Sequence, residues 1–160
     1  MEAGIKEQLN AFLTTAQAHM TFLNAVENFP VERINDFPPH VDYSPWMLLE
    51  HIRITQKDIL DFLVEPVYKE QKWPDEYWPK KTEKADEKKW KQTIKEYKKD
   101  LDRLVAYLEK PSTDLVARVK NGDGQTVIRE LIMVIDHTSY HIGEFAILRQ
   151  IMGTWPKGHK

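Results

Sequence analysis

The sequence predicts an all-α protein with the architecture of a four-helix bundle, on three observations. Apolar residues recur every three or four positions over most of the 160 residues, as they do along one face of a helix. No segment shows a convincing alternation of apolar and polar residues, which would indicate a half-buried strand. Prolines and the turn sequence of residues 121–124 divide the periodic region into four segments. This length suits one hydrophobic core, so we expect a single domain over residues 1–160.

The first segment is predicted to be one long helix that ends before Pro30 and the proline-rich residues 37–39. His19 falls on its apolar stripe, and we interpret it as a core or rim histidine rather than a site residue. The stripe consists of Ile5, Leu9, Phe12, Ala16, His19, Leu23 and Val26.

The second helix is predicted to begin at Ser44-Pro45 and to stop at Pro66. Serine can accept a hydrogen bond from a free N–H of the first turn, and proline fits the first helical position. Its inward face is expected to carry Leu48, His51, Ile52, Thr55, Ile59, Phe62 and Leu63.

A connection over residues 64–83 follows, rich in proline and aromatic residues, among them Trp73, Tyr77 and Trp78. A connection this long inside a compact domain usually has a function or packs over another element. The sequence leaves three alternatives open: a cover across the end of the bundle, a dimer contact, or tryptophans that cap the core.

The third helix, roughly Glu83 to Glu109, has an apolar stripe without any metal-ligating side chain, so we expect it to be purely structural. A turn follows at residues 121–124, and the apolar residues just before it could form a short extended piece. The fourth helix is predicted from about Gln125 to Met152, because Gly153 is a typical C-terminal stop.

Composition limits the classes of partner. Hydrophobic residues make up 41% and charged residues 30%, an ordinary globular balance, and the net charge is only −2. The lysines of residues 80–99 are interspersed with acidic residues, which predicts a solvated helix face rather than a nucleic-acid surface. The N-terminus lacks the pattern of a secretion signal, and no apolar run is long enough to cross a bilayer. We therefore expect a cytoplasmic protein without nucleic-acid or membrane partners.

The histidines carry the main functional signal. His137 and His141 lie four residues apart, which brings both imidazoles to the same helix face one turn apart. Glu130 and Glu144 extend that face in opposite directions, and buried polar groups need partners such as a metal ion. His51, on the inward face of the second helix, is the third candidate ligand.

Three imidazoles suit zinc, nickel or iron(II) better than magnesium or calcium, and three protein ligands leave a position open for water or substrate. The absence of cysteine excludes a cysteine-ligated zinc site and a thiolate nucleophile. Thr138 occupies the position at which the helix motif of zinc proteases has glutamate, which argues against such a peptidase. From spacing alone, hydrogen-bonded core histidines remain the alternative. His40, in a loop, and His159, in the tail, are given no role.

Two segments together resemble the DinB-like family. Residues 137–144, His-Thr-Ser-Tyr-His-Ile-Gly-Glu, and the run to Gly153-Thr-Trp-Pro resemble its last helix. Residues 44–51, Ser-Pro-Trp-Met-Leu-Leu-Glu-His, resemble the start of its second helix. The resemblance implies an up-down-down-up bundle, a divalent metal near one end bound by His51, His137 and His141, and frequent homodimers. Several relatives transfer low-molecular-weight thiols such as bacillithiol or mycothiol, and others are described as metal-dependent hydrolases.

One residue departs from the family pattern, because Glu144 stands where glutamine is common. A glutamate there could bind the metal, change the charge of the site, or accept a proton as a catalytic residue. The leading hypothesis is a metal-activated thiol or water that attacks a small-molecule substrate. The rival is a non-catalytic, metal-stabilised bundle that binds a partner protein through aromatic residues of the 64–83 connection.

Overall fold

The computed structural model describes residues 2–158, and within that range it is helical without a named strand. A single antiparallel bridge, Arg118 to Thr126, is all that forms in the region for which a short extended piece was expected. The helices are α1 (Glu2–Thr14), α2 (Phe22–Val26), α3 (Pro45–Val64), α4 (Glu87–Glu109) and α5 (Val127–Met152), with a 3-10 turn at Val31–Arg33.

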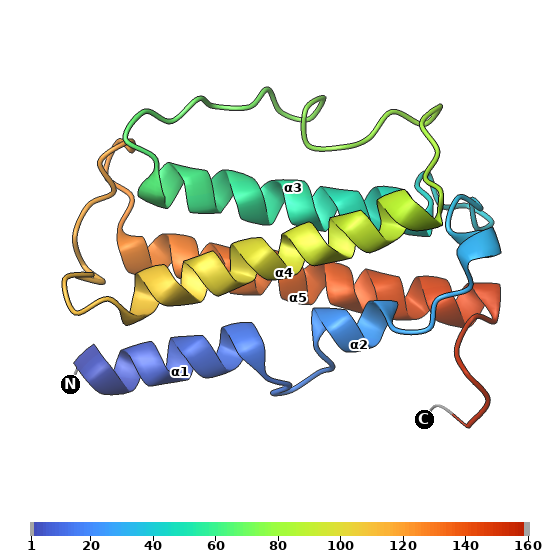
Figure 1. Cartoon of the computed structure of the whole chain (residues 1–160), viewed down its shortest axis with the longest axis horizontal. Helices are drawn as coiled ribbons and strands as arrows, with labels where there is room; N and C mark the ends of the chain where they lie inside the picture. The colour runs from blue at the N-terminus through green and yellow to red at the C-terminus, as the bar shows by residue number, and fades with distance from the viewer. Residues whose placement is uncertain (1, 159–160) are drawn as a thin grey trace.

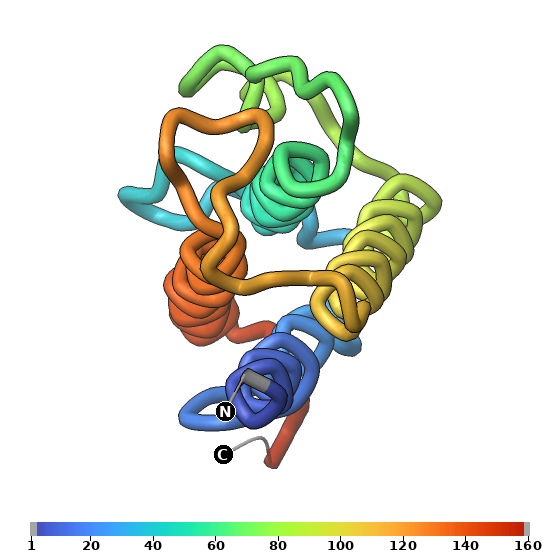
Figure 2. Tube along the Cα trace, turned by 90° about the vertical axis from the view of Figure 1, so that its left-hand side faces the viewer, coloured from blue at the N-terminus to red at the C-terminus, as the bar shows by residue number. Residues whose placement is uncertain are grey.

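The helices form the predicted bundle, with α1 and α2 together taking the place of its first member (Figure 1). α1 and α2 run in one direction, α3 and α4 both run in the opposite direction, and α5 returns in the first. This is the up-down-down-up order, and Figure 2 shows the bundle from one end. α3 packs against both α4 and α5, which places α3 and α5 side by side in opposite directions.

The prediction of one long first helix is wrong, because the helix stops at Thr14. The hydroxyls of Thr14 and Thr15 hydrogen-bond the carbonyls four residues earlier, and side chains of this kind compete with helical bonding. Thr21 and Asn24 then form a capping box that starts α2. His19 therefore lies in the exposed break between the two helices, and its expected place on an inward helical stripe is wrong as well.

The predicted ends of α3 and α5 are close to the observed ones. Ser44 caps α3 by accepting a hydrogen bond from the Met47 amide, 3.3 Å away, and Pro45 is the first helical residue. Gly153 ends α5 in the left-handed conformation, with φ of 63°, which glycine adopts without a steric penalty. α4 begins at Glu87, after the cap Asp86, a few residues later than predicted.

The core consists of two clusters that meet along α5. The first is built around Trp46 and Phe145, and the second contains Leu131 and Val134. His137 and His141 lie on α5 between Val134 and Phe145, so packed side chains hold the helix on both sides of the histidines.

The connection between α3 and α4, which we call the strap and define as residues 65–86, runs along the outside of α3 for most of its length (Figures 1 and 2). Trp73 is 71% exposed, whereas Trp78 is partly buried against the first core cluster. The strap therefore covers a side of the bundle rather than its end.

No helix within residues 2–158 has the length and apolar character needed to cross a membrane.

Candidate metal centre

Three histidines from two helices meet at one point in the bundle. The Nε2 atom of His51 on α3 lies 3.1 Å from Nε2 of His141 and 3.1 Å from Nε2 of His137, both on α5. His51 and His141 are buried and His137 is half-buried. Among the residues that the structure describes, these three form the one group of histidine and acidic side chains whose ligand atoms converge closely enough for a metal ion.

The outer ring nitrogens of two of these histidines face hydrogen-bond acceptors. Nδ1 of His51 lies 2.9 Å from the main-chain carbonyl oxygen of Tyr77, and Nδ1 of His141 lies 2.6 Å from the Glu144 carboxylate. A carbonyl and a carboxylate only accept hydrogen bonds, so each Nδ1 carries the hydrogen. In the neutral rings, both Nε2 atoms are then bare acceptors that face one another.

Two acceptors 3.1 Å apart cannot form a hydrogen bond with each other, and a cation between them relieves the conflict. Imidazole nitrogens are favoured ligands of zinc, nickel and iron. The donor set of the site therefore fits a divalent transition metal.

Burial keeps the three imidazoles neutral. Burial is the main reason why the pKa of His51 is lowered to about 4, although the hydrogen bond to the Tyr77 carbonyl opposes the change. Burial, together with the neighbouring His141 and His51, lowers the pKa of His137 to about 3. The pKa of His141 is also lowered, mainly by burial, although Glu144 opposes the change. Neutral imidazole is the form that binds metal, so no proton has to leave these rings at neutral pH.

Comparison with known proteins identifies the family. The family model described as mycothiol-S-transferase matches residues 8–153, which include all three histidines. The chain belongs to the mycothiol-S-transferase family. This family is DinB-like, so the resemblance inferred from the histidine motifs is confirmed. No curated protein and no solved structure matched the chain.

In this mycothiol-S-transferase family member, Glu144 lies behind His141 rather than at the point where the Nε2 atoms converge. It accepts the hydrogen of His141 Nδ1 and also contacts two tyrosines. Burial and then the Glu144 carboxylate raise the pKa of Tyr43 to about 12, and a hydrogen bond to Glu144 raises the pKa of Tyr140. This position suits a residue that orients His141.

A groove leads away from the histidines between α3, the strap and the first half of α5. Thr55 lies about one turn beyond His51, and Met133 lies one turn before His137, so the groove and the site share the same helix faces. Glu130, the other acidic residue predicted on this face, is buried in the groove wall and pairs with Arg129. The structure therefore brings Glu130 to the groove and not to the histidines.

The groove also contains polar atoms whose hydrogen bonds are incomplete. Within residues 2–158, Thr55 Oγ1 and Gln125 Oε1 are buried and find no hydrogen-bond partner. Both side chains line the groove, which leaves them for a bound molecule or solvent.

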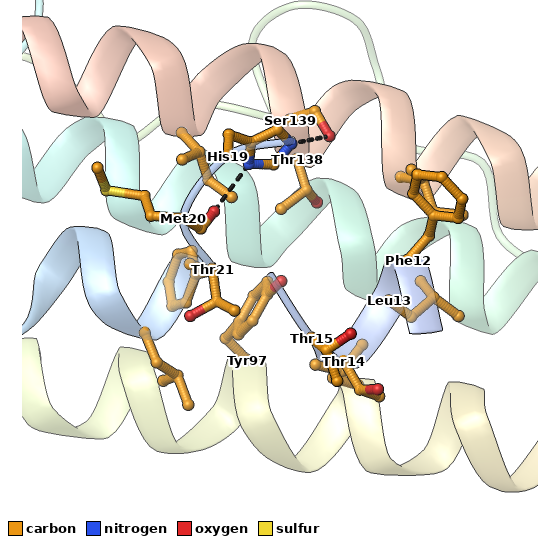
Figure 3. Close-up of a pocket in the computed structure, with 15 residues that line it drawn as sticks. Phe12, Leu13, Thr14, Thr15, His19, Met20, Thr21, Tyr97, Thr138 and Ser139 are labelled. Carbon is orange, nitrogen blue, oxygen red and sulfur yellow. Dashed lines mark hydrogen bonds between the residues drawn. The ribbon is translucent and has the colours of Figure 1, made fainter. Parts of the chain in front are cut away.

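A second, more enclosed pocket lies between the break in the first helix, α4 and α5 (Figure 3). His19 reaches across it, with Nε2 2.9 Å from the Ser139 hydroxyl and Nδ1 2.7 Å from the Met20 carbonyl oxygen. Ser139 and Thr138 point to a different side of α5 from His137 and His141, so His19 is not part of the metal centre.

Of the two remaining histidines, the structure describes only His40, which is not part of the metal centre. His40 is exposed in a loop with φ of 63°. His159 lies beyond the described residues.

Proposed function

We propose that this protein binds one divalent transition metal through His51, His137 and His141 and transfers a low-molecular-weight thiol to a small electrophile. The observation that carries the proposal is the contact between the bare Nε2 atoms of His51 and His141, which a cation satisfies. Membership of the mycothiol-S-transferase family supports the thiol, and mycothiol is therefore the first cosubstrate to test. Zinc and nickel are the first metals to test, followed by iron.

A bound divalent ion would supply Lewis acidity, which lowers the pKa of a thiol so that its thiolate exists near neutral pH. The protein contributes the arrangement around it. The Tyr77 carbonyl and the Glu144 carboxylate accept the Nδ1 hydrogens of His51 and His141, which orients both rings and leaves their Nε2 atoms free to bind the metal. We propose Glu144 as an orienting residue, because its carboxylate lies against Nδ1 of His141.

The groove beside the histidines is the proposed substrate site. Its polar lining can hydrogen-bond a hydrophilic molecule, and its end at Met133 and Thr55 adjoins the histidines. In the proposed reaction, the thiolate sulfur forms a bond to an electrophilic carbon of the substrate. The bond from that carbon to the leaving group breaks, the leaving group keeps the electron pair, and the thiol proton passes to solvent.

Metal analysis of the wild type and of three variants tests the ligand set. We expect about one ion per chain in the wild type and a loss of the ion in His51→Ala and His137→Ala. His19→Ala is the matched control, because its histidine lies in the second pocket, and it should keep the ion. A wild type that takes up neither zinc nor nickel would contradict the proposal.

Consumption of monochlorobimane tests the chemistry, because chloride leaves as the thiol adds. Loss that requires both mycothiol and metal supports thiol transfer. Metal-dependent turnover of ester or amide substrates with water alone would instead favour the hydrolase alternative. A cytoplasmic location fits the proposal, because low-molecular-weight thiols are kept reduced there.

A non-catalytic bundle is the second candidate, and one observation favours it. The outer face of α5 exposes several large apolar side chains, and exposed apolar residues on one face mark interaction surfaces. They are Ile132, Tyr140, Ile147 and Ile151. This candidate would be favoured if metal raised the thermal stability of the protein while no activity were found with a panel of thiol and ester substrates. The homodimer implied by the DinB-like resemblance stays a prediction, which sedimentation analysis tests.

A further inference from the structure

Two consecutive residues of the strap, Tyr77 and Trp78, contact the imidazole of His51. The main-chain carbonyl of Tyr77 accepts the hydrogen of His51 Nδ1, 2.9 Å away. The ring of Trp78 stacks on the imidazole, with ring centroids 3.9 Å apart and an angle of 6° between the planes. The hydrogen bond fixes which nitrogen is protonated, and the stacking fixes the plane of the ring.

A buried carboxylate on α3 holds the strap in this position. Asp58 lies seven residues after His51, two turns along the same helix face, and it is 8% exposed. Its Oδ2 accepts a hydrogen bond from the Tyr77 hydroxyl at 2.6 Å, and its Oδ1 accepts one from the Tyr68 hydroxyl at 2.9 Å. Gln71 makes a longer contact of 3.4 Å. Three strap residues therefore meet one carboxylate.

Asp58 makes no ion pair with any residue that the structure describes. A buried carboxylate without a cationic partner is costly unless hydrogen bonds satisfy it. The strap hydroxyls supply these bonds, and hydrogen bonds to a charged acceptor are stronger than neutral ones. The attachment of the strap at Asp58 is therefore expected to be firm, and Tyr77 connects it directly to His51.

We propose that Asp58 is a positioning residue for His51. It holds the Tyr77 side chain in place. The carbonyl of the same residue then keeps the hydrogen of His51 on Nδ1, and the indole of Trp78 fixes the plane of the imidazole ring. As far as this concerns metal affinity, it rests on the proposed function. The competing explanation is that Asp58 only attaches a surface connection to the bundle.

Two tyrosine variants separate these explanations. Tyr77→Phe removes the hydroxyl that links Asp58 to the residue touching His51. Tyr68→Phe is the matched control, because it removes a hydroxyl from the same carboxylate but from a residue without a contact to His51. We expect Tyr77→Phe and Asp58→Asn to lower metal affinity by about 10-fold, as measured by competition with a chelator. Tyr68→Phe should change it by less than about 2-fold.

The geometry of the metal centre can also be followed by spectroscopy, in addition to the metal affinity. The visible absorption bands of the cobalt(II)-substituted protein should shift in Tyr77→Phe and Asp58→Asn and stay as in the wild type in Tyr68→Phe. Equal losses of thermal stability in Tyr77→Phe and Tyr68→Phe, with wild-type affinity and spectra in both, would overturn the positioning role.

The metal-free protein separates a failure of this inference from a failure of the proposed function. Nitrogen-15 NMR of the wild-type ring of His51 should show hydrogen on Nδ1 and none on Nε2. In Tyr77→Phe the spectrum should show a mixture of both tautomers. This result would support the positioning role even if no metal binds, whereas an unchanged tautomer in Tyr77→Phe would refute it.

Discussion

Nε2 of His51 lies 3.1 Å from Nε2 of His141, and the outer nitrogen of each ring is committed to an acceptor. The two rings come from helices whose histidines are 90 residues apart in the sequence. The antiparallel packing of α3 on α5 brings them together, and the half-buried His137 completes the group.

Metal should stabilise the folded protein. An ion that binds only the folded state adds about 2.7 kcal/mol when its free concentration is 100 times the Kd. Differential scanning calorimetry with and without zinc should show a higher Tm with metal for the wild type and for His19→Ala. His51→Ala should show no such shift, and a shift of wild-type size in this variant would contradict the ligand assignment.

Acid should destabilise the metal-free protein. The pKa values of His51 and His137 are lowered to about 4 and about 3, whereas unfolded histidines titrate near 6.5. The unfolded state therefore binds more protons, so stability is fully present above pH 6.5 and is lost as the pH falls toward 4. At pH 5.5 the expected loss is about 3 kcal/mol for the two residues together. Urea unfolding at pH 7.5 and 5.5, with chelator present, measures it.

The control for the acid effect is His137→Asn, which removes one of the titrating rings. Its stability should fall by about 1.4 kcal/mol less than that of the wild type over the same pH interval. Equal losses in both proteins would show that His137 is not held neutral by burial.

Substitutions of Glu144 distinguish an orienting residue from a proton acceptor. Glu144→Gln keeps an oxygen that can accept the hydrogen of His141 Nδ1, so an orienting role predicts metal affinity and thiol-transfer rates within a few-fold of the wild type. Glu144→Ala should lower metal affinity by about 10-fold. A loss of about 100-fold or more in kcat for Glu144→Gln, at full metal content, would show proton transfer instead.

Arg149 should be a large contributor to stability. Its side chain is fully buried, and its guanidinium donates to the carbonyls of Ala25, Glu27 and Thr154. Arg149→Met would leave these carbonyls without their donor and is expected to cost about 3–5 kcal/mol in urea unfolding. Arg33→Met, which breaks an exposed ion pair, should cost less than about 1 kcal/mol. Similar costs for both variants would contradict the role of Arg149.

Much of the fold is readable from local sequence signals. Ser44-Pro45 and Gly153 mark the ends of α3 and α5 because capping depends on a few adjacent residues. The break after Thr14 also had a local signal, the capping box of Thr21 and Asn24, but the apolar period across residues 5–26 concealed it.

The pairing of His137 with His141 follows from helical spacing alone, because residues four apart share a helix face. The sequence suggested His51 as the third ligand from its place on the inward face of the second helix, and the family resemblance supported it, but such a position does not say which helix lies opposite. Tertiary packing decided that contact, the placement of Trp78 on His51, and the burial of Arg149 against the distant carbonyls of Ala25 and Glu27. These are contacts between segments far apart in the chain, and their geometry depends on how whole helices pack rather than on any local pattern.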